Sequence, residues 1–423
     1  MQLQTDRVRF NVGGKFFEIT ATTLANAGRN SVFGAMFDDQ WNLRPREVND
    51  EYFIDRNPEC FSVLLDLLRT DELHVPPNIP EKLFYREALY YGLLDNVRTA
   101  KWGRFDGNKL KLTSSVQGPA PHGCTAIRAS PDGGFAVAHG SIVHVYNWML
   151  EEREPLNLDY RIVNDIAWLD SENIVVSAGE RLGEGDGAMG LFSSSTGDFR
   201  HRFEMKNTTA GALCFNSDSK IFACFWDQVT GKQIEFYNAS PDWSLGDAAK
   251  IQWLNGSNRL FVSSLSPWEE HSHIGYLDIR TDKKVTWSWS WSKVDQIGAI
   301  YDAIAMEESN SICVVCGHDD LVFMDMRFTA GSSSFKWNQG NRENRNYIRP
   351  CYPKLALHGG QVFYSRDDGI SLFSGPDSIL TSSLGKSSGG ETRDFSISGG
   401  RLFVLHSEEN VFDVWETPSP AVI

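Results

Sequence analysis

Short apolar runs separated by turn residues fill the chain from about residue 108 onward. The stretch "SPDGGFAVAHG" (Ser130–Gly140) joins a glycine-rich turn to a strand-like run, and six similar phrases follow it. The first strong apolar residues of these phrases lie at intervals of 39, 47, 39, 52, 50 and 40 residues: Phe135, Ile174, Ile221, Leu260, Ile312, Val362 and Leu402. Such periods are typical of β-propeller blades and of a few helical repeat arrays.

The residue types in the runs decide between strands and helices. Each phrase is preceded by one apolar run, such as "CTAIRAS" or "VNDIAWLD", and followed by another, such as "IVHVYNW" or "DLVFMDMRF". β-Branched and aromatic residues fill these runs, turn residues separate them, and none of them is long enough for a helix. The pattern therefore predicts an all-β repeat with at least three strands in each unit.

A fourth strand completes a propeller blade, and the chain supplies it unevenly. "GDFRHRFEM" and "SSFKWNQ" provide it in two units, whereas only "PSPAVI" follows the last third strand. A propeller can close by taking the missing strand from the segment before its first blade, which removes an exposed sheet edge. "NKLKLTSSV" (Asn108–Val116) lies in that position. We therefore predict a seven-bladed propeller over residues 108–418.

The ends of the third strands carry a family resemblance. "LDIRT" (Leu277–Thr281) and "MDMRF" (Met324–Phe328) resemble the WD40 family, with the family's Trp replaced. The family's Gly-His is also absent from its usual place, so its hydrogen-bond tetrad is not carried over. The resemblance implies a divergent, WD40-like propeller. Kelch propellers are the alternative, but their diglycine follows the second strand, whereas Gly133-Gly134, Gly359-Gly360 and Gly399-Gly400 precede it.

The first hundred residues show a different pattern. Two strand-like runs, "DRVRFNVGG" and "KFFEITATTL", join through Gly13-Gly14 as a hairpin. Asn57-Pro58 has the chemistry of a helix start, and apolar residues then follow at helical spacing: Phe61, Leu64, Leu65 and Leu68. A second helix is predicted from Pro80 through "EKLFYREALYYGLL". These elements indicate a small α/β domain over residues 6–100.

Four sequence segments of this domain show a second family resemblance. "NVGGKFFEITATTL", "SVFGAMF", "EYFIDRNPECFSVLLDLLRTDEL" and "REALYYGLL" closely resemble the BTB/POZ fold of the potassium-channel-tetramerisation (KCTD/T1) type. The resemblance implies self-assembly into a homo-oligomer of four or five copies. It also implies that Asp55 and Arg56, in the family word "FIDR", lie near the subunit interface. A local Asp-Arg pair that helps to start the next helix is the alternative for these two residues.

The stretch "MFDDQWNLRP" (Met36–Pro45) carries the other implication of this resemblance. In BTB adaptors this neighbourhood contacts a cullin. The resemblance implies a cullin-3 contact that includes Met36, with Phe37 and Trp41 as apolar anchors and Asp38 and Asp39 as charges at its rim. The alternative is a solvated loop that leads out of a helix.

Composition and charge exclude several function classes. The net charge of −15 is spread over the chain, with 13 basic against 16 acidic residues up to Asn108 and 27 against 39 afterwards. Neither part therefore resembles a nucleic-acid-binding domain. "MQLQTDRVRF" lacks the apolar core of a signal peptide, and no run of 18 apolar residues occurs. We expect a cytoplasmic or nuclear protein without membrane insertion, and not a channel subunit.

Two motifs of the propeller region resemble metal-binding or nucleotide-binding sequences, but both lie in strand-like text. Cys313-x-x-Cys316 lies in "SICVVCG", where residues three apart point to opposite faces and cannot share a metal ion. "GEGDGAMG" (Gly183–Gly190) contains G-x-G-x-x-G, but strand-like text follows it in place of the required helix. We therefore predict no catalytic, cofactor-binding or metal-binding residue and no enzyme activity.

The aromatic run "TWSWSWS" places three tryptophans on one face of a predicted strand: Trp287, Trp289 and Trp291. The rings either pack between neighbouring blades or form an exposed patch that anchors a partner. Together, these features predict a substrate-specific adaptor of a cullin-3 RING E3 ubiquitin ligase, in which the BTB domain binds cullin-3 and the propeller recruits a protein substrate. The alternative is a non-ligase oligomeric scaffold or an accessory subunit of a membrane or signalling complex.

Overall fold

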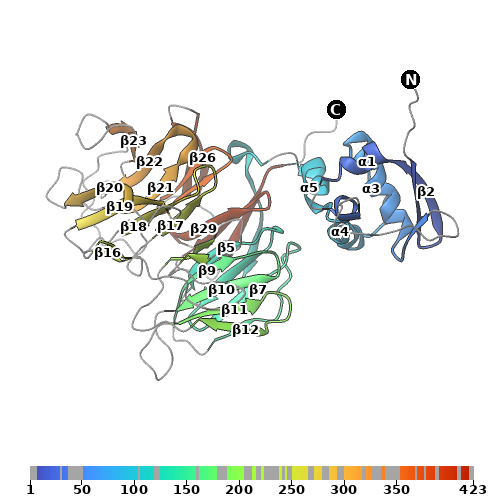
Figure 1. The fold of residues 1–423 in the computed structure, drawn as a ribbon, viewed down its shortest axis with the longest axis horizontal. Coiled ribbons are helices and arrows are strands. Elements are labelled where there is room, and N and C mark those ends of the chain that lie inside the picture. The colour runs from blue at the N-terminus through green and yellow to red at the C-terminus, as the bar shows by residue number, and fades with distance from the viewer. Residues whose placement is uncertain are drawn as a thin grey trace. The chain divides into compact units, whose positions relative to one another are not determined.

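The computed structural model describes residues 7–28, 31–36, 51–102, 105–118, 124–158, 162–178, 188–203, 212–215, 221–222, 238–240, 243–244, 250–264, 271–278, 285–292, 300–316, 321–325, 335–338, 353–366, 369–375, 378–385, 390–406 and 411–418. The chain divides into two compact units (Figure 1). One comprises residues 1–105 with 417–423, and the other comprises residues 106–416. Each unit has its own core.

The first unit combines a three-stranded sheet with helices. Strand β1 (Arg7–Val12) pairs antiparallel with β2 (Lys15–Thr20) and parallel with β3 (Glu51–Ile54). The helices are α1 (Ala21–Ala25), α2 (Val32–Met36), α3 (Pro58–Thr70), α4 (Glu81–Tyr90) and α5 (Leu94–Trp102). Gly13 and Gly14 make the β1–β2 turn with φ values of 54° and 91°, a region that glycine adopts without steric cost. The predicted hairpin is confirmed.

Helix α3 begins where its sequence predicts. The side chain of Asn57 accepts hydrogen bonds from the backbone N–H groups of Glu59 and Cys60, and Pro58 occupies the first turn. The apolar face of α3 is buried and contributes Phe61 to an aromatic cluster. The ring centroids of Phe61 and Tyr91 are 5.2 Å apart. The predicted helix start and its buried face are both confirmed.

The second unit consists of antiparallel sheets. Six four-stranded sheets occur among the described residues: five contain four strands that follow one another along the chain, and the sixth combines three such strands with β4. The sheets are β5 (Cys124–Ala129), β6 (Phe135–His139), β7 (Ile142–Tyr146) and β8 (Leu156–Asn157); β9 (Val163–Trp168), β10 (Asn173–Ala178), β11 (Ala188–Ser193) and β12 (Phe199–Phe203); β17 (Lys250–Leu254), β18 (Arg259–Ser264), β19 (His271–Asp278) and β20 (Val285–Ser292); β21 (Ile300–Met306), β22 (Ser311–Cys316), β23 (Leu321–Asp325) and β24 (Phe335–Asn338); β25 (Leu355–His358), β26 (Gln361–Arg366), β27 (Gly369–Ser374) and β28 (Ile379–Gly385); and β29 (Thr392–Ser398), β30 (Arg401–His406), β31 (Val411–Glu416) and β4 (Lys111–Gln117).

The third of the predicted repeat units is described only in part. Two short pairs lie there, β13 (Cys214–Phe215) with β14 (Ile221–Phe222) and β15 (Asn238–Ser240) with β16 (Trp243–Ser244). The fourth strands that the sequence predicts at "GDFRHRFEM" and "SSFKWNQ" are β12 and β24. The fourth strands β8 and β28 lie in segments that the sequence analysis did not mark as strands.

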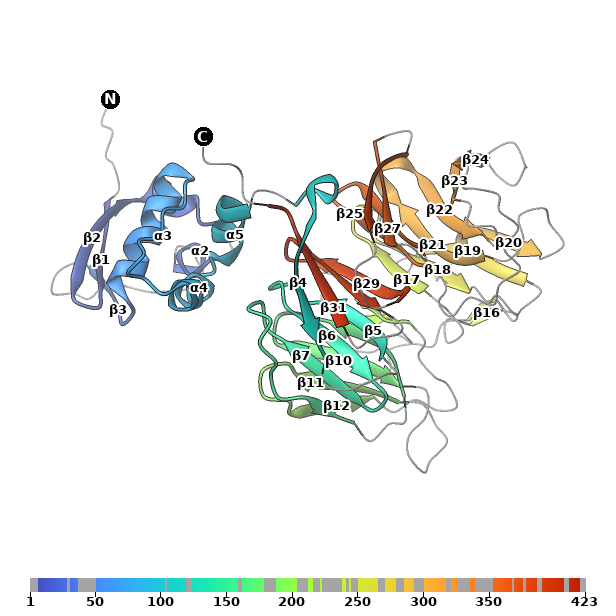
Figure 2. The ribbon, with the colours of Figure 1, turned by 180° about the vertical axis from the view of Figure 1, so that it is seen from behind.

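Strand β4 completes the last sheet, as the sequence predicts (Figure 2). It follows the 3-10 helix η1 (Gly107–Lys109) and pairs antiparallel with β31. The hydroxyl of Ser115 also donates a hydrogen bond of 2.6 Å to the carboxylate of Asp413. Arg401 on β30 connects this last sheet to the β5–β8 sheet. Its Nη1 donates a hydrogen bond of 3.1 Å to the carbonyl oxygen of Gly133. Arg401, Asp394 and Ser396 of the last sheet thus hold the first sheet through hydrogen bonds.

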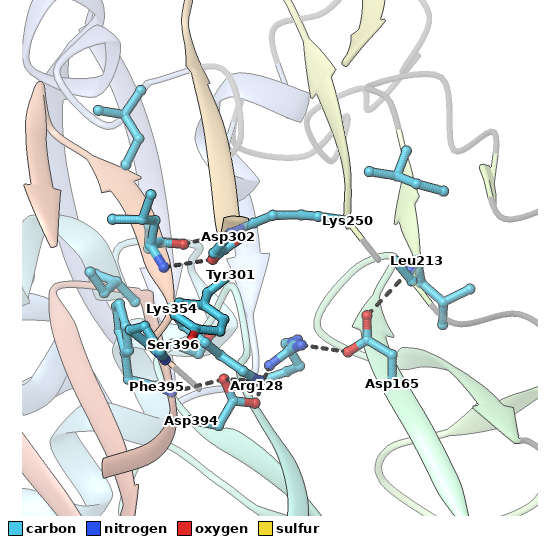
Figure 3. A pocket seen from close by; sticks show the side chains of 17 residues that line it. Arg128, Asp165, Leu213, Lys250, Tyr301, Asp302, Lys354, Asp394, Phe395 and Ser396 are labelled. Carbon is cyan, nitrogen blue, oxygen red and sulfur yellow. Dashed lines mark hydrogen bonds and ion pairs between the residues drawn. The ribbon is translucent and has the colours of Figure 1, made fainter. Parts of the chain in front are cut away.

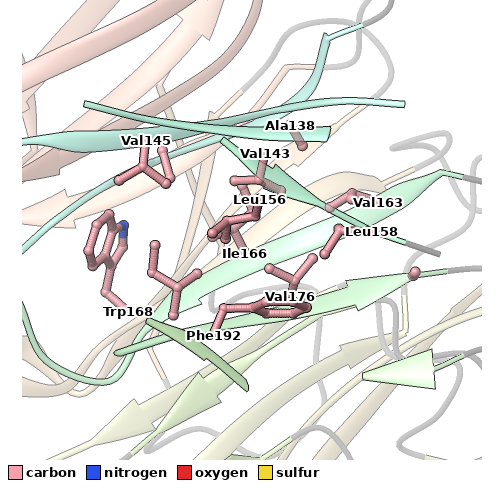
Figure 4. Packing of buried hydrophobic residues seen from close by; sticks show 13 residues of the cluster. Ala138, Val143, Val145, Leu156, Leu158, Val163, Ile166, Trp168, Val176 and Phe192 are labelled. Atoms are coloured by element: carbon pink, nitrogen blue, oxygen red, sulfur yellow. The ribbon is translucent and has the colours of Figure 1, made fainter. Parts of the chain in front are cut away.

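Neighbouring sheets pack face to face through apolar side chains. Between the β5–β8 and β9–β12 sheets, buried side chains from both interlock, among them Val145, Ile166 and Trp168 (Figure 4). Similar clusters join β17–β20 to β21–β24, β21–β24 to β25–β28, and β29–β4 to β5–β8. The first strands of neighbouring sheets contact one another, and β29 contacts β5. This arrangement of consecutive sheets around their first strands is that of a β-propeller.

Candidate functional site

A polar cavity lies among the first strands of the propeller. It has a volume of about 370 Å³. The apolar run that precedes each repeated phrase is called here its first-strand run, and all seven of these runs contribute to the wall of the cavity. The lining residues are Arg128 (β5); Asp165 (β9); Ala212 and Leu213, just before β13; Lys250 and Ile251 (β17); Tyr301 and Asp302 (β21); Pro353 to Leu357, before and within β25; and Asp394 to Ile397 (β29). Figure 3 shows the charged ends of Arg128, Asp165 and Asp394 pointing toward one another.

Three aspartates of the wall, Asp165, Asp302 and Asp394, occupy equivalent positions near the starts of their strands. The strand pairing shifts register immediately before each of them, which marks a β-bulge. One oxygen of each carboxylate accepts the backbone N–H of the next residue. The distances are 2.9 Å for Ile166, 2.8 Å for Ala303 and 3.0 Å for Phe395. The bulge and this local hydrogen bond together fix the direction of the side chain.

The second oxygen of each carboxylate reaches the following first strand. Asp165 accepts the backbone N–H of Leu213 at 3.2 Å, and Asp302 accepts that of Leu355 at 2.6 Å. Asp394 accepts the backbone N–H of Ile127 at 3.1 Å. These N–H groups lie at buried positions, where an unpaired donor is costly. Each aspartate therefore connects two neighbouring first strands, and Asp394 connects the last strand of this set to the first.

Three cations complete the set, and each pairs with the aspartate of the sheet that follows its own. The Arg128 guanidinium lies 2.6 Å from Asp165 and 2.7 Å from Asp394. Lys354 Nζ lies 2.9 Å from Asp394, and Lys250 Nζ lies 2.7 Å from Asp302. Arg128 thus also bridges the aspartates on either side of its sheet. Buried carboxylates and cations are tolerated together because each supplies the partner that the other needs.

The two aspartates beside Arg128 have opposite pKa shifts. Burial alone would raise the pKa of Asp394, but the charges of Arg128 and Lys354 and the hydrogen bonds from Lys354 and Ile127 outweigh it and lower the pKa to about 2. Burial raises the pKa of Asp165, and the charge of Arg128 offsets that effect only in part. Burial would lower the pKa of Arg128, but both carboxylates raise it. Asp394 is therefore the more firmly ionised of the two aspartates.

None of these six residues was predicted from the sequence as part of a site. A usable signal was present, because an aspartate stands directly before an apolar residue near the start of three of these runs, "VNDIAWLD", "YDAIAMEE" and "RDFSISG". Their partners lie in other repeats, so the pairing itself could not be read from spacing. The three carboxylates accept hydrogen bonds from backbone N–H groups and pair with cations. We therefore assign them structural and binding roles.

Of the residues expected to contact a cullin, only Met36 lies among those described. It ends α2, and its side chain is buried. Phe37, Asp38, Asp39 and Trp41 lie outside the described residues. The structure therefore leaves this part of the expected cullin contact untested.

The expected self-assembly residues occupy different environments. Asp55 is exposed after β3. Arg56 donates to both carboxylate oxygens of Glu87, at 2.9 and 3.1 Å, and its guanidinium carbon lies 4.2 Å from the ring centroid of Tyr90. Glu87 is only 5% exposed. Arg56 thus holds α4 against the start of α3 and does not form the local pair with Asp55 that the sequence left open.

The tryptophan run lies on β20, at the edge of its four-stranded sheet. Trp287, Trp289 and Trp291 alternate with serines along this strand, opposite positions of β19. Their side chains lie outside the described part of the chain. The choice between inter-blade packing and an exposed patch therefore stays a prediction.

The two motifs rejected from the sequence behave as expected. Cys313 and Cys316 are buried on β22 and belong to two different apolar clusters, which lie on opposite faces of the sheet. The glycine-rich stretch leads into strand β11, not into a helix. Within the ranges that the structure describes, no three His, Cys, Asp or Glu side chains are grouped to hold a metal ion. No described helix has the length and apolar character needed to span a bilayer.

Comparisons with known proteins assign both units. Residues 8–100 match the BTB/POZ domain model, and residues 118–417 match the model of the At2g24240-like C-terminal β-propeller. Two Arabidopsis thaliana proteins, BTB/POZ domain-containing proteins At2g24240 and At4g30940, are 57% and 56% identical over the whole of both chains. Mouse BTB/POZ domain-containing protein KCTD9 is 34% identical over 91 residues, which cover 21% of this chain and 26% of that protein.

These matches agree with the two compact units and with the resemblance in the N-terminal words. The propeller model alone covers more than half of the chain, and the two Arabidopsis relatives match it from end to end. The chain therefore belongs to the At2g24240-like family, whose members join an N-terminal BTB/POZ domain of the KCTD-like type to a C-terminal β-propeller.

Proposed function

We propose that the chain is a substrate-recruiting adaptor of a cullin-3 RING E3 ubiquitin ligase. In this proposal the BTB/POZ domain binds cullin-3, and the propeller binds a protein substrate. The observation that carries it is the presence, in one chain, of a KCTD-like BTB/POZ domain and a propeller. The inner carboxylates of that propeller hold its strands together, which favours a binding role over a catalytic one.

The proposed propeller has seven WD40-like blades. Six four-stranded sheets support six of these blades, and the short pairs β13–β14 and β15–β16 lie where the seventh is proposed. The seven first-strand runs all line the same cavity, which supports a single wheel. The loops at the ends of such a wheel offer a large surface for a folded or extended partner.

The proposed assembly contains four or five copies. Joining several propellers through their BTB/POZ domains would raise the apparent affinity for a substrate with repeated or clustered sites, because later contacts become intramolecular. The family resemblance supports this part of the proposal, and Asp55 is the exposed residue through which it can be examined.

Binding of the full chain to the N-terminal region of cullin-3, measured by isothermal titration calorimetry, tests the ligase proposal. We expect saturable binding at micromolar concentrations or below. Replacing Phe37 and Trp41 together by Ala should weaken binding about tenfold or more, as expected for apolar interface anchors. Phe16→Ala is the matched control, because Phe16 is a 68% exposed aromatic residue of β2 outside that stretch.

Absence of binding at micromolar concentrations would remove the ligase proposal. The remaining candidate would then be a non-ligase oligomeric scaffold or an accessory subunit of a membrane or signalling complex. Undiminished binding by the Phe37 and Trp41 double variant would keep the adaptor role and remove these two residues from the contact.

A further inference from the structure

The charged groups that line the propeller cavity differ in how far they reach the solvent. The side chains of Asp165, Asp302 and Asp394 are 11%, 9% and 2% exposed. Their cationic partners are more open, with Arg128 at 29%, Lys250 at 28% and Lys354 at 38%. In each pair the carboxylate is therefore the more buried partner and the cation the more accessible one.

Hydrogen-bond capacity shows the same asymmetry. The carboxylate of Asp394 accepts four bonds, from Phe395 N, Ile127 N, Arg128 and Lys354, which fills its usual capacity. Lys354 Nζ carries three donors, and within the described ranges of the chain it pairs with Asp394 alone. Lys250 Nζ uses two of its three donors, on Asp302 and on the carbonyl oxygen of Leu355. The cavity therefore has donors to spare, and its most buried acceptor is already occupied.

The rest of the wall limits which anion fits. Apolar side chains lie beside the charged ones, among them Ile251, Leu355 and Phe395. A cavity of about 370 Å³ is at the small end for ligand sites. The three carboxylates beside the cations repel added negative charge, so a singly charged group is favoured over a phosphate dianion. A carboxylate on a short methylene stem meets these conditions.

We propose that the propeller cavity binds an acidic side chain from a peptide segment of a partner protein, with Lys354 and Lys250 donating to its carboxylate. This inference deepens the proposed function, and it rests on that function only for identifying the partner as a ligase substrate. Ion pairing in a partly enclosed cavity is stronger than at an open surface, because the local dielectric constant is lower.

Fluorescence anisotropy with a labelled alternating Gly-Glu decapeptide and the purified full chain tests this inference. We expect saturable binding of this peptide and none of the alternating Gly-Gln decapeptide. Lys354→Gln should weaken binding about tenfold, as expected for loss of a charge-assisted hydrogen bond. Lys354→Arg should restore most of the affinity, because it keeps a cation there. Lys109→Gln is the matched control, since Lys109 is 69% exposed and pairs with Asp106 of the neighbouring turn.

Equal affinity of the wild type and Lys354→Gln, or equal binding of the two peptides, would overturn the proposal. Tighter binding of inorganic triphosphate than of the Gly-Glu peptide would also overturn it, because the site would then select phosphate. If Lys354→Gln does not fold, Lys250→Gln provides the same comparison on another strand. Cullin-3 binding is measured on the same preparations, so loss of the peptide site and failure of the adaptor role remain distinguishable.

Discussion

The carboxylate of Asp394 accepts the backbone N–H of Ile127 at 3.1 Å, across 267 residues of chain. This contact joins the first strand of the last sheet to the first strand of the first sheet. Two similar bonds, from Leu213 to Asp165 and from Leu355 to Asp302, join other neighbouring strands. A single aspartate position, reused in different repeats, thus holds the inner strands of the propeller together.

Replacing Asp394 by Asn should destabilise the propeller by about 3 kcal/mol, because Arg128 and Lys354 lose a buried counter-charge. Urea unfolding followed by tryptophan fluorescence measures this, since most tryptophans, from Trp148 to Trp415, lie in the propeller unit. Glu308→Gln removes one negative charge at an exposed position and serves as the control. Its free energy of unfolding should change by about 0.5 kcal/mol or less. Equal stabilities of the two variants would contradict the structural role of Asp394.

The same carboxylate should make stability depend on pH. The pKa of Asp394 falls from an ordinary 3.8 to about 2 in the folded state. The folded state therefore binds this proton more weakly than the unfolded state, and the stabilisation is present above pH 3.8 and lost as the pH falls toward 2. Its size is about 2 kcal/mol. The stability difference between wild type and Asp394→Asn should shrink by this amount between pH 5 and pH 2. A difference that stays constant over this range would show that Asp394 keeps an ordinary pKa.

Replacing Arg56 by Met should destabilise the BTB/POZ domain by about 2 kcal/mol, because Glu87 would remain buried without its cation. Arg56→Lys keeps the charge but not the paired hydrogen bonds, so its effect should be intermediate. Hydrogen exchange of the α4 amides reports the change locally. Unaltered protection of α4 in Arg56→Met would show that the Arg56–Glu87 pair contributes little.

Replacing Asp55 by Arg should reduce the mass of the assembly, if this exposed residue lies at the subunit interface. Light scattering coupled to size-exclusion chromatography measures the mass of the full chain directly. We expect four or five copies for the wild type and smaller species for the variant. Asp66→Arg makes the same charge reversal at a side chain that is 66% exposed on α3 and should leave the mass unchanged. An unchanged mass for Asp55→Arg would place the interface elsewhere.

Local patterns predicted much of this fold. The start of α3 depends on Asn57 and Pro58, which are neighbours in the chain, and the closing strand β4 follows from a missing fourth strand in the last unit. Both could be read from spacing and turn chemistry. The burial of Cys313 and Cys316 on opposite faces of β22 follows from the two-residue period of a strand.

Long-range pairs could not be read in the same way. Arg56 lies 31 residues before Glu87, and Asp394 lies 267 residues after Ile127, so no local spacing relates these partners. The aspartates near the starts of three first-strand runs were visible in the sequence, but their role depends on which strands become neighbours. The cavity and its half-buried lysines therefore emerged only from the folded arrangement.

The central claim is that one chain joins a cullin to an acidic partner segment. Biolayer interferometry on immobilised N-terminal cullin-3 tests it, with the full chain captured first and the labelled Gly-Glu decapeptide added next. We expect the peptide signal only after the chain is bound, and about a tenfold weaker peptide affinity for Lys354→Gln at equal capture. A captured chain that retains no peptide, or a cullin surface that captures no chain, would contradict the claim.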